Sequence, residues 1–81
     1  IEGAMALGLS KDVATTLTAQ TMLGAATLLD QSGKSATTLR ENVTSPNGTT
    51  AAALASLNES DFAGIVAKAM KAARDRSQEL A

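Results

Sequence analysis

Residues 62–80 read FAGIVAKAMKAARDRSQEL and carry the clearest structural pattern in the chain. Apolar side chains recur there at helical spacing and share one face: Phe62, Ile65, Val66, Ala69, Met70, Ala73 and Leu80. Polar and charged side chains take the opposite face: Lys68, Lys71, Asp75, Gln78 and Glu79. We therefore predict an amphipathic helix, capped by Ser60 or Asp61, with Lys71 and Asp75 paired one turn apart.

A second long helix is predicted between Ser10 and about Ser32. Ser10 is a good N-cap residue, Asp12 favours the first turn, and Gly33 can end the helix. Small side chains are frequent along it: Ala14, Thr15, Thr16, Ala19, Thr21, Gly24, Ala25 and Ala26. Because small residues let another helix backbone approach closely, we expect this helix to be central and largely buried.

Shorter helices complete the expected fold. Residues 1–7 resemble the tail of a helix that ends at Gly8, and Ser35 can cap a helix through about Val43. A turn around Pro46 then precedes an alanine-rich helix over residues 49–57. No strand is predicted, so we expect an all-α small helical bundle that forms a single domain over residues 1–81.

Composition limits how such a bundle can be stabilised. A chain of 81 residues buries a modest fraction of its surface, and this one has no cysteine and no histidine for disulfides or common metal sites. Phe62 is the only aromatic residue. We therefore expect oligomerisation to supply the missing burial. Because the chain begins with Ile1 in what resembles a helix tail, we also expect it to be part of something longer.

The charge pattern argues against nucleic acid as a partner. The net charge is -1, and the basic residues Lys68, Lys71, Arg74 and Arg76 are interleaved with acidic ones. A helix-turn-helix DNA-binding protein would need a basic face that this pattern does not give. No apolar run is long enough for a membrane span and no secretory signal is evident, so we expect a cytoplasmic protein.

Acidic side chains that could serve as general acids or bases are scattered: Asp30, Glu41, Asp61 and Glu79. No pair of them shares a helix face beside an apolar pocket, and exposed carboxylates are usually solvated. We therefore assign no catalytic residue and no metal site to this chain.

Residues 43–50, VTSPNGTT, form the one segment whose composition is suited to binding a ligand. A rigid turn, a glycine and several hydroxyls directly precede a helix, whose first N–H groups lack intrahelical partners and attract anions. Gly48 would let a ligand approach the backbone, while Ser45, Thr49 and Thr50 would add hydroxyl donors. The alternative is that Thr49 simply caps the helix and nothing binds.

Several blocks of sequence, taken together, resemble one known family. They are Gly8-Leu9, Ala19-Gln20-Thr21, Gly24-Ala25-Ala26, Val43-Thr44-Ser45-Pro46, Gly48-Thr49-Thr50, Phe62, Arg76-Ser77 and Glu79-Leu80. In order and spacing they are similar to the C-terminal domain of pyrroline-5-carboxylate reductase, along nearly the whole chain. The Thr-Ser-Pro-x-Gly-Thr-Thr block is the specific part, because alanine-rich helices occur in any small bundle.

This resemblance implies an interlocked homodimer, which could assemble further, built from the C-terminal domain of a 6-phosphogluconate-dehydrogenase-like reductase. It implies a part in proline biosynthesis, where hydride passes from NADPH or NADH to the C=N bond of pyrroline-5-carboxylate. The family holds its cofactor in a Rossmann domain, and nothing here resembles the glycine-rich fingerprint of that domain. We therefore expect the chain alone to bind no cofactor and to be inactive.

The resemblance also implies roles for individual residues. In the family the loop that matches residues 45–50 grips the substrate carboxylate, so Ser45 and Thr50 would donate hydroxyls, and Gly48 and Thr49 backbone N–H groups. Asn42 would lie near the nicotinamide end of the cofactor. Asn47 stands where the family usually has a second glycine; asparagine tolerates left-handed dihedrals, so we expect the turn to survive.

A different class of function stays open on the sequence. The chain could be a stand-alone helical protein-interaction module without a ligand, because it shows no cofactor fingerprint and no group fitted to acid–base catalysis.

Overall fold

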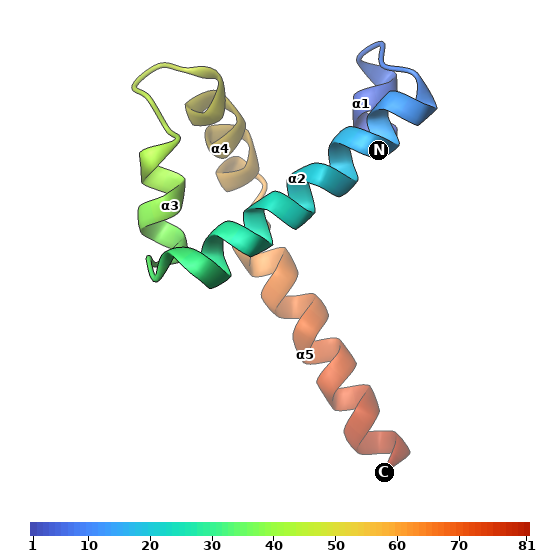
Figure 1. Cartoon of the computed structure of the whole chain (residues 1–81). Coiled ribbons are helices and arrows are strands. Elements are labelled where there is room, and N and C mark those ends of the chain that lie inside the picture. The colour runs from blue at the N-terminus through green and yellow to red at the C-terminus, as the bar shows by residue number, and fades with distance from the viewer. The chain divides into compact units, whose positions relative to one another are not determined.

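The computed structural model describes every residue from 1 to 81 and contains helices only. They are α1 (Glu2–Ala6), α2 (Lys11–Ser32), α3 (Ala36–Asn42), α4 (Thr49–Glu59) and α5 (Phe62–Leu80) (Figure 1). The all-α prediction is confirmed. None of these helices combines the length and apolar character needed to cross a membrane.

The junction between α1 and α2 follows the predicted capping residues. Gly8 has a left-handed φ of 109°; its N–H bonds the Met5 carbonyl at 3.0 Å, and the Leu9 N–H bonds the Ala4 carbonyl at 3.2 Å. These two bonds form a Schellman motif that ends α1. Ser10 then caps α2, because its hydroxyl accepts the Val13 N–H at 3.3 Å.

The two helices that flank the predicted turn are short. Ser35 caps α3 as expected, since its hydroxyl accepts the Thr38 N–H at 3.1 Å. Helix α4 continues to Glu59, two residues beyond the predicted end at Leu57. Alanine and leucine are strong helix formers, and no glycine or proline interrupts this stretch before Ser60.

The link from α4 to α5 consists of only Ser60 and Asp61. Asp61 occupies the N-cap position of α5 with a left-handed φ of 54° but forms no side-chain capping bond. Its carboxyl group lies over Gly64, where a Cβ atom would stand 2.7 Å from Asp61 Cγ. Of the two residues predicted to cap α5, Ser60 and Asp61, the structure puts Asp61 at the N-cap position; the predicted capping bond does not form, because Asp61 is in a left-handed conformation.

The predicted pairing on α5 is also confirmed. Lys71 Nζ lies 2.6 Å from Asp75 Oδ2, one helical turn away. Arg74 contacts the other oxygen of Asp75 at 2.9 Å, and Arg76 pairs with Glu79 at 3.0 Å. These ion pairs are exposed, so each contributes little to stability.

The chain divides into two compact units, Ile1–Arg40 and Glu41–Ala81. In the first unit α1 packs against α2, and in the second α4 packs against α5. The assignment of residues 1–81 to a single functional domain stays a prediction.

Neither unit has a substantial core of its own. Ala14 is the only buried residue of the chain. The expectation that α2 is largely buried is wrong for the single chain, because Met22 is 70% exposed and Leu23 62% exposed. Within its own unit the short α1 is the main helix that packs against α2, so most apolar side chains of α2 stay exposed.

Candidate functional site

The turn that precedes α4 has a defined backbone geometry. The Ser45 carbonyl accepts the Gly48 N–H at 3.1 Å, with Pro46 and Asn47 at the two central positions. Proline sets the first central φ, and Asn47 supplies the positive φ, 60°, that a type II turn requires at the second. Asparagine thus adopts the left-handed conformation that was expected of it.

Ser45 and Gly48 lie in close proximity across this turn. A Cβ atom on Gly48 would stand 2.5 Å from Ser45 Oγ and 3.2 Å from the Ser45 carbonyl oxygen. The φ of Gly48 is -84°, which any residue can adopt, so the lack of a side chain matters here for space rather than for backbone freedom. The hydroxyl of Ser45 lies beside the start of α4.

The N-terminus of α4 is left open by the protein. Gly48 is its N-cap residue and no side chain caps the helix. The first N–H with an intrahelical acceptor belongs to Ala52, which bonds the Gly48 carbonyl at 3.1 Å. The alternative in which Thr49 caps α4 is wrong, because Thr49 is the first residue inside the helix. The amides of residues 49–51 are accordingly placed to donate to an external acceptor.

The other predicted site residues are distributed around this turn. Thr50 follows Thr49 in the first turn of α4; Thr50 is half-buried and Thr49 exposed. Asn42 is the last residue of α3, exposed and without a side-chain hydrogen bond. The structure thus brings Ser45 and Gly48 together and sets both threonines directly after them, but no bond connects Asn42 to the turn. The expectation that the Gly48 N–H is a free backbone donor is wrong, because this N–H already donates to the Ser45 carbonyl at 3.1 Å.

The turn carries no charged side chain, so its attraction for an anion would come from neutral dipolar groups. No charged residue occurs between Glu41 and Glu59. Any anion bound there would be held by amide and hydroxyl donors and by the positive end of the α4 dipole. No group of acidic, histidine or cysteine side chains in the chain could hold a metal ion.

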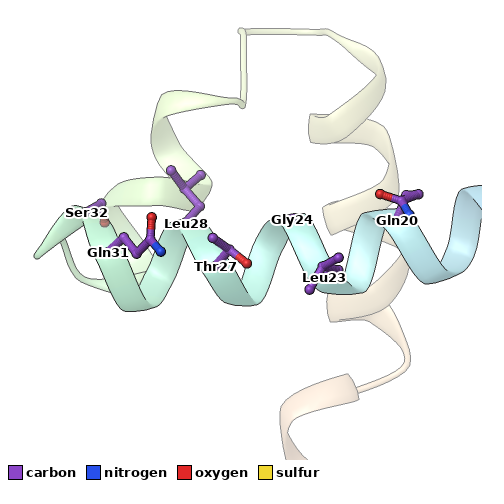
Figure 2. A pocket seen from close by; sticks show the side chains of 7 residues that line it. All are labelled: Gln20, Leu23, Gly24, Thr27, Leu28, Gln31 and Ser32. Carbon is purple, nitrogen blue, oxygen red and sulfur yellow. The ribbon is translucent and has the colours of Figure 1, made fainter.

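A separate hollow of about 450 Å³ lies along α2. Figure 2 shows that every side chain lining it comes from this one helix: Gln20, Leu23, Gly24, Thr27, Leu28, Gln31 and Ser32. A smaller hollow of about 250 Å³ near the start of α2 is lined by Asp12, Val13, Thr16 and Leu17. Hollows lined by a single helix do not enclose a small molecule; an apolar surface interrupted by Gly24 suits the approach of another helix.

The small residues of α2 are evident in the sequence, whereas the hollow was not predicted. The available signal was the spacing of Leu23, Thr27 and Leu28 around Gly24, which puts them on neighbouring turns of one face.

Known proteins resemble this chain in sequence along nearly its whole length. A sequence model described as pyrroline-5-carboxylate reductase dimerisation matches residues 1–80. A pyrroline-5-carboxylate reductase of Pseudomonas aeruginosa is 49% identical over 75 residues, covering 93% of this chain and 28% of its own length. The Pisum sativum protein of the same name is 44% identical over 79 residues, covering 98% of this chain and 29% of its own length.

A solved structure of the same family has a similar fold. The crystal structure of Plasmodium falciparum pyrroline carboxylate reductase with NADP bound superposes with a TM-score of 0.91 at 32% sequence identity. The match covers 94% of this chain and 29% of the Plasmodium chain. The chain therefore spans under a third of the length of these relatives. A match over residues 1–80, with the same helical fold, shows that the chain belongs to the pyrroline-5-carboxylate reductase dimerisation family.

Proposed function

We propose that this chain is the dimerisation and substrate-carboxylate-binding part of an enzyme that reduces 1-pyrroline-5-carboxylate to L-proline with NADPH or NADH. The family match over residues 1–80 carries this proposal. A part in proline biosynthesis and a cytoplasmic location belong to the same proposal.

The turn before α4 supports the substrate role. Pyrroline-5-carboxylate carries a carboxylate, and the amides of Thr49 and Thr50 begin a helix that the protein itself leaves uncapped. The hydroxyl of Ser45 lies against Gly48 at the same place, and the half-buried Thr50 can add a second hydroxyl. Since no charged residue lies in this segment, we expect carboxylate binding to depend on these donors and to change little with pH near neutrality.

The nicotinamide cofactor needs a binding unit of a different kind. The chain is built of helices and contains no strand–turn–helix unit of the sort that cradles a dinucleotide. We propose that another part of the enzyme holds the cofactor, with Asn42, at the end of α3, facing its nicotinamide end.

Exposed apolar side chains on single helices support a homodimer as the working form. Apolar side chains of α2 and α5, such as Leu23 and Ile65, would supply much of this interface. We propose that two copies interlock through these helices.

The substrate role is tested by paired isosteric substitutions in the complete reductase. Thr50→Val removes a proposed hydroxyl donor, so KM for pyrroline-5-carboxylate should rise by about tenfold, equivalent to a lost hydrogen bond to a charged group. KM for the cofactor should change little. Thr49→Val is the control, because Thr49 is proposed to donate its amide and not its hydroxyl. Equal kinetics for the two variants would remove Thr50 from the site.

The assembly is tested by size-exclusion chromatography with light scattering on the purified chain. The expected mass is twice that of the 8.2 kDa chain, or a multiple of the dimer. A stable monomer that binds an unrelated protein but no proline analogue would support the alternative of a stand-alone interaction module.

A further inference from the structure

The turn before α4 contains an asparagine directly before a glycine. In such a pair the backbone nitrogen of the glycine can react with the asparagine side chain without any ligand or enzyme. Asn47 is exposed, lies outside any helix and forms no side-chain hydrogen bond. We propose that Asn47 is a site of spontaneous deamidation, in which the Gly48 amide converts the Asn47 carboxamide to aspartate and isoaspartate.

The chemistry needs only these two residues and water. The backbone nitrogen of Gly48 attacks Cγ of Asn47, so a new N–Cγ bond closes a five-membered succinimide ring. The bond from Cγ to the carboxamide nitrogen breaks, and ammonia leaves with the proton that Gly48 gives up. Water then adds to one of the two ring carbonyls and opens the ring. Opening at one carbonyl gives aspartate and at the other isoaspartate, with no change of oxidation state.

The surroundings of Asn47 favour this reaction over the same reaction at the other two asparagines. Glycine has no side chain to hinder the attacking nitrogen. Asn42 precedes the β-branched Val43 at the end of α3, and Asn58 lies within α4, where helical hydrogen bonds hold the backbone. The Gly48 N–H is held by a single bond, 3.1 Å to the Ser45 carbonyl, in an exposed turn. Opening that one bond frees the nitrogen to react.

The fold itself keeps the reactive pair in place. Position 47 needs a residue that tolerates a φ of 60°, which favours asparagine and glycine over most others. At position 48 a Cβ atom would stand 2.5 Å from Ser45 Oγ, so any other residue would make the Ser45 hydroxyl turn away. The turn therefore favours asparagine or glycine at position 47 and leaves glycine the least obstructed residue at position 48.

Deamidation would place a negative charge directly before the open amides of α4. A carboxylate at that position is attracted by the helix N-terminus and would compete with an external carboxylate for the same donors. Isoaspartate would also lengthen the backbone of the turn by one carbon. This consequence, unlike the reaction, rests on the proposed substrate site.

The reaction is tested on the dimeric fraction of the purified chain, incubated in native buffer at neutral and mildly alkaline pH and analysed by peptide mapping. The Asn47 carboxamide should be lost faster than those of Asn42 and Asn58 by at least about tenfold, a barrier lower by about 1.4 kcal/mol. Loss should accelerate with pH and yield peptides that an isoaspartate-specific methyltransferase labels. An intact Asn47, over a period in which the urea-unfolded chain loses it, would overturn the proposal by showing that the turn protects the residue.

The consequence is tested separately in the complete reductase with Asn47→Asp and Asn47→Gly. The first variant adds the charge and should raise KM for pyrroline-5-carboxylate, while the second removes the reactive carboxamide and should leave KM close to that of the starting enzyme. An unchanged KM for Asn47→Asp would overturn the claim that the charge matters, without affecting the reaction. Failure of the carboxylate site itself would appear differently, as no response to Thr50→Val.

Discussion

Ser45 Oγ lies 2.5 Å from the position that a Cβ atom would occupy on Gly48, while the Ser45 carbonyl accepts the Gly48 N–H at 3.1 Å. One serine thus both closes the turn and fills the space beside the glycine. The two residues should therefore be energetically coupled, although each is exposed or only half-buried.

This coupling predicts the behaviour of Gly48→Ala. The added methyl group should displace the exposed Ser45 hydroxyl and destabilise the turn by about 0.5 kcal/mol, the scale of surface substitutions. In the Ser45→Ala background the same substitution should cost less, because the conflicting oxygen is absent. Denaturant unfolding of the two single variants and the double variant would measure the coupling. Additive free energies would show that Ser45 does not constrain position 48.

The left-handed conformation of Asn47 predicts an order of stability among substitutions. Asn47→Gly should change the free energy of unfolding by less than about 1 kcal/mol, whereas Asn47→Ala should cost about 1 kcal/mol, since alanine disfavours a positive φ. Thermal unfolding of the three proteins would establish the order. If alanine proved as stable as asparagine, the type II geometry assigned to the turn would be wrong.

Asp61 and Gly64 form a second pair of residues whose substitutions should have coupled effects on stability. Alanine in a helix interior is normally better than glycine by about 1 kcal/mol, but at position 64 the Asp61 carboxyl group occupies the space of its methyl group. Gly64→Ala should therefore stabilise the protein more in the Asp61→Gly background than alone. A chemical denaturation series would test this. The reverse order would place the Asp61 side chain elsewhere.

The ion pairs of α5 predict that the stability of the folded protein depends slightly on pH. The hydrogen bond from Lys71, and then that from Arg74, lowers the pKa of the Asp75 carboxyl below its usual value of 3.8. Because the folded pKa is the lower one, the stabilisation is present above about pH 4 and is lost as the pH falls through the folded value. Asp75→Asn should thus lower the melting temperature slightly at neutral pH and not in strong acid. High salt should reduce the effect, since the pair is exposed.

The apolar face of α5 predicts which substitutions disrupt the proposed dimer. Ile65 is 56% exposed in the single chain, so Ile65→Glu should leave the isolated helix intact but weaken dimerisation by about 2–4 kcal/mol if the residue is buried between copies. Gln78→Glu introduces the same charge on the opposite face and serves as the control. Analytical ultracentrifugation would give both dissociation constants. Similar values would exclude this face from the interface.

Local structure in this protein was predictable because its signals are local. Ser10 and Gly33 bound α2, the spacing of Phe62 and Ile65 marks the face of α5, and Pro46 with Asn47 specifies the turn. Each depends on dihedral preferences or hydrogen bonds that span at most a few residues. The sequence could not show that Asp61 takes a left-handed conformation, because aspartate has an equally strong preference for capping a helix in the usual extended geometry.

The sequence by itself determined that the chain is helical, where most helices begin and end, and which turn offers open amides. Tertiary structure alone decided what is buried: α2 was expected to be internal, yet in the single chain only Ala14 is covered. The physical reason is that helix formation is governed by interactions within a few residues, whereas burial depends on which surfaces meet. The small and apolar side chains of α2 indicate that another helix can pack closely against it. They do not indicate that this partner lies outside its own unit.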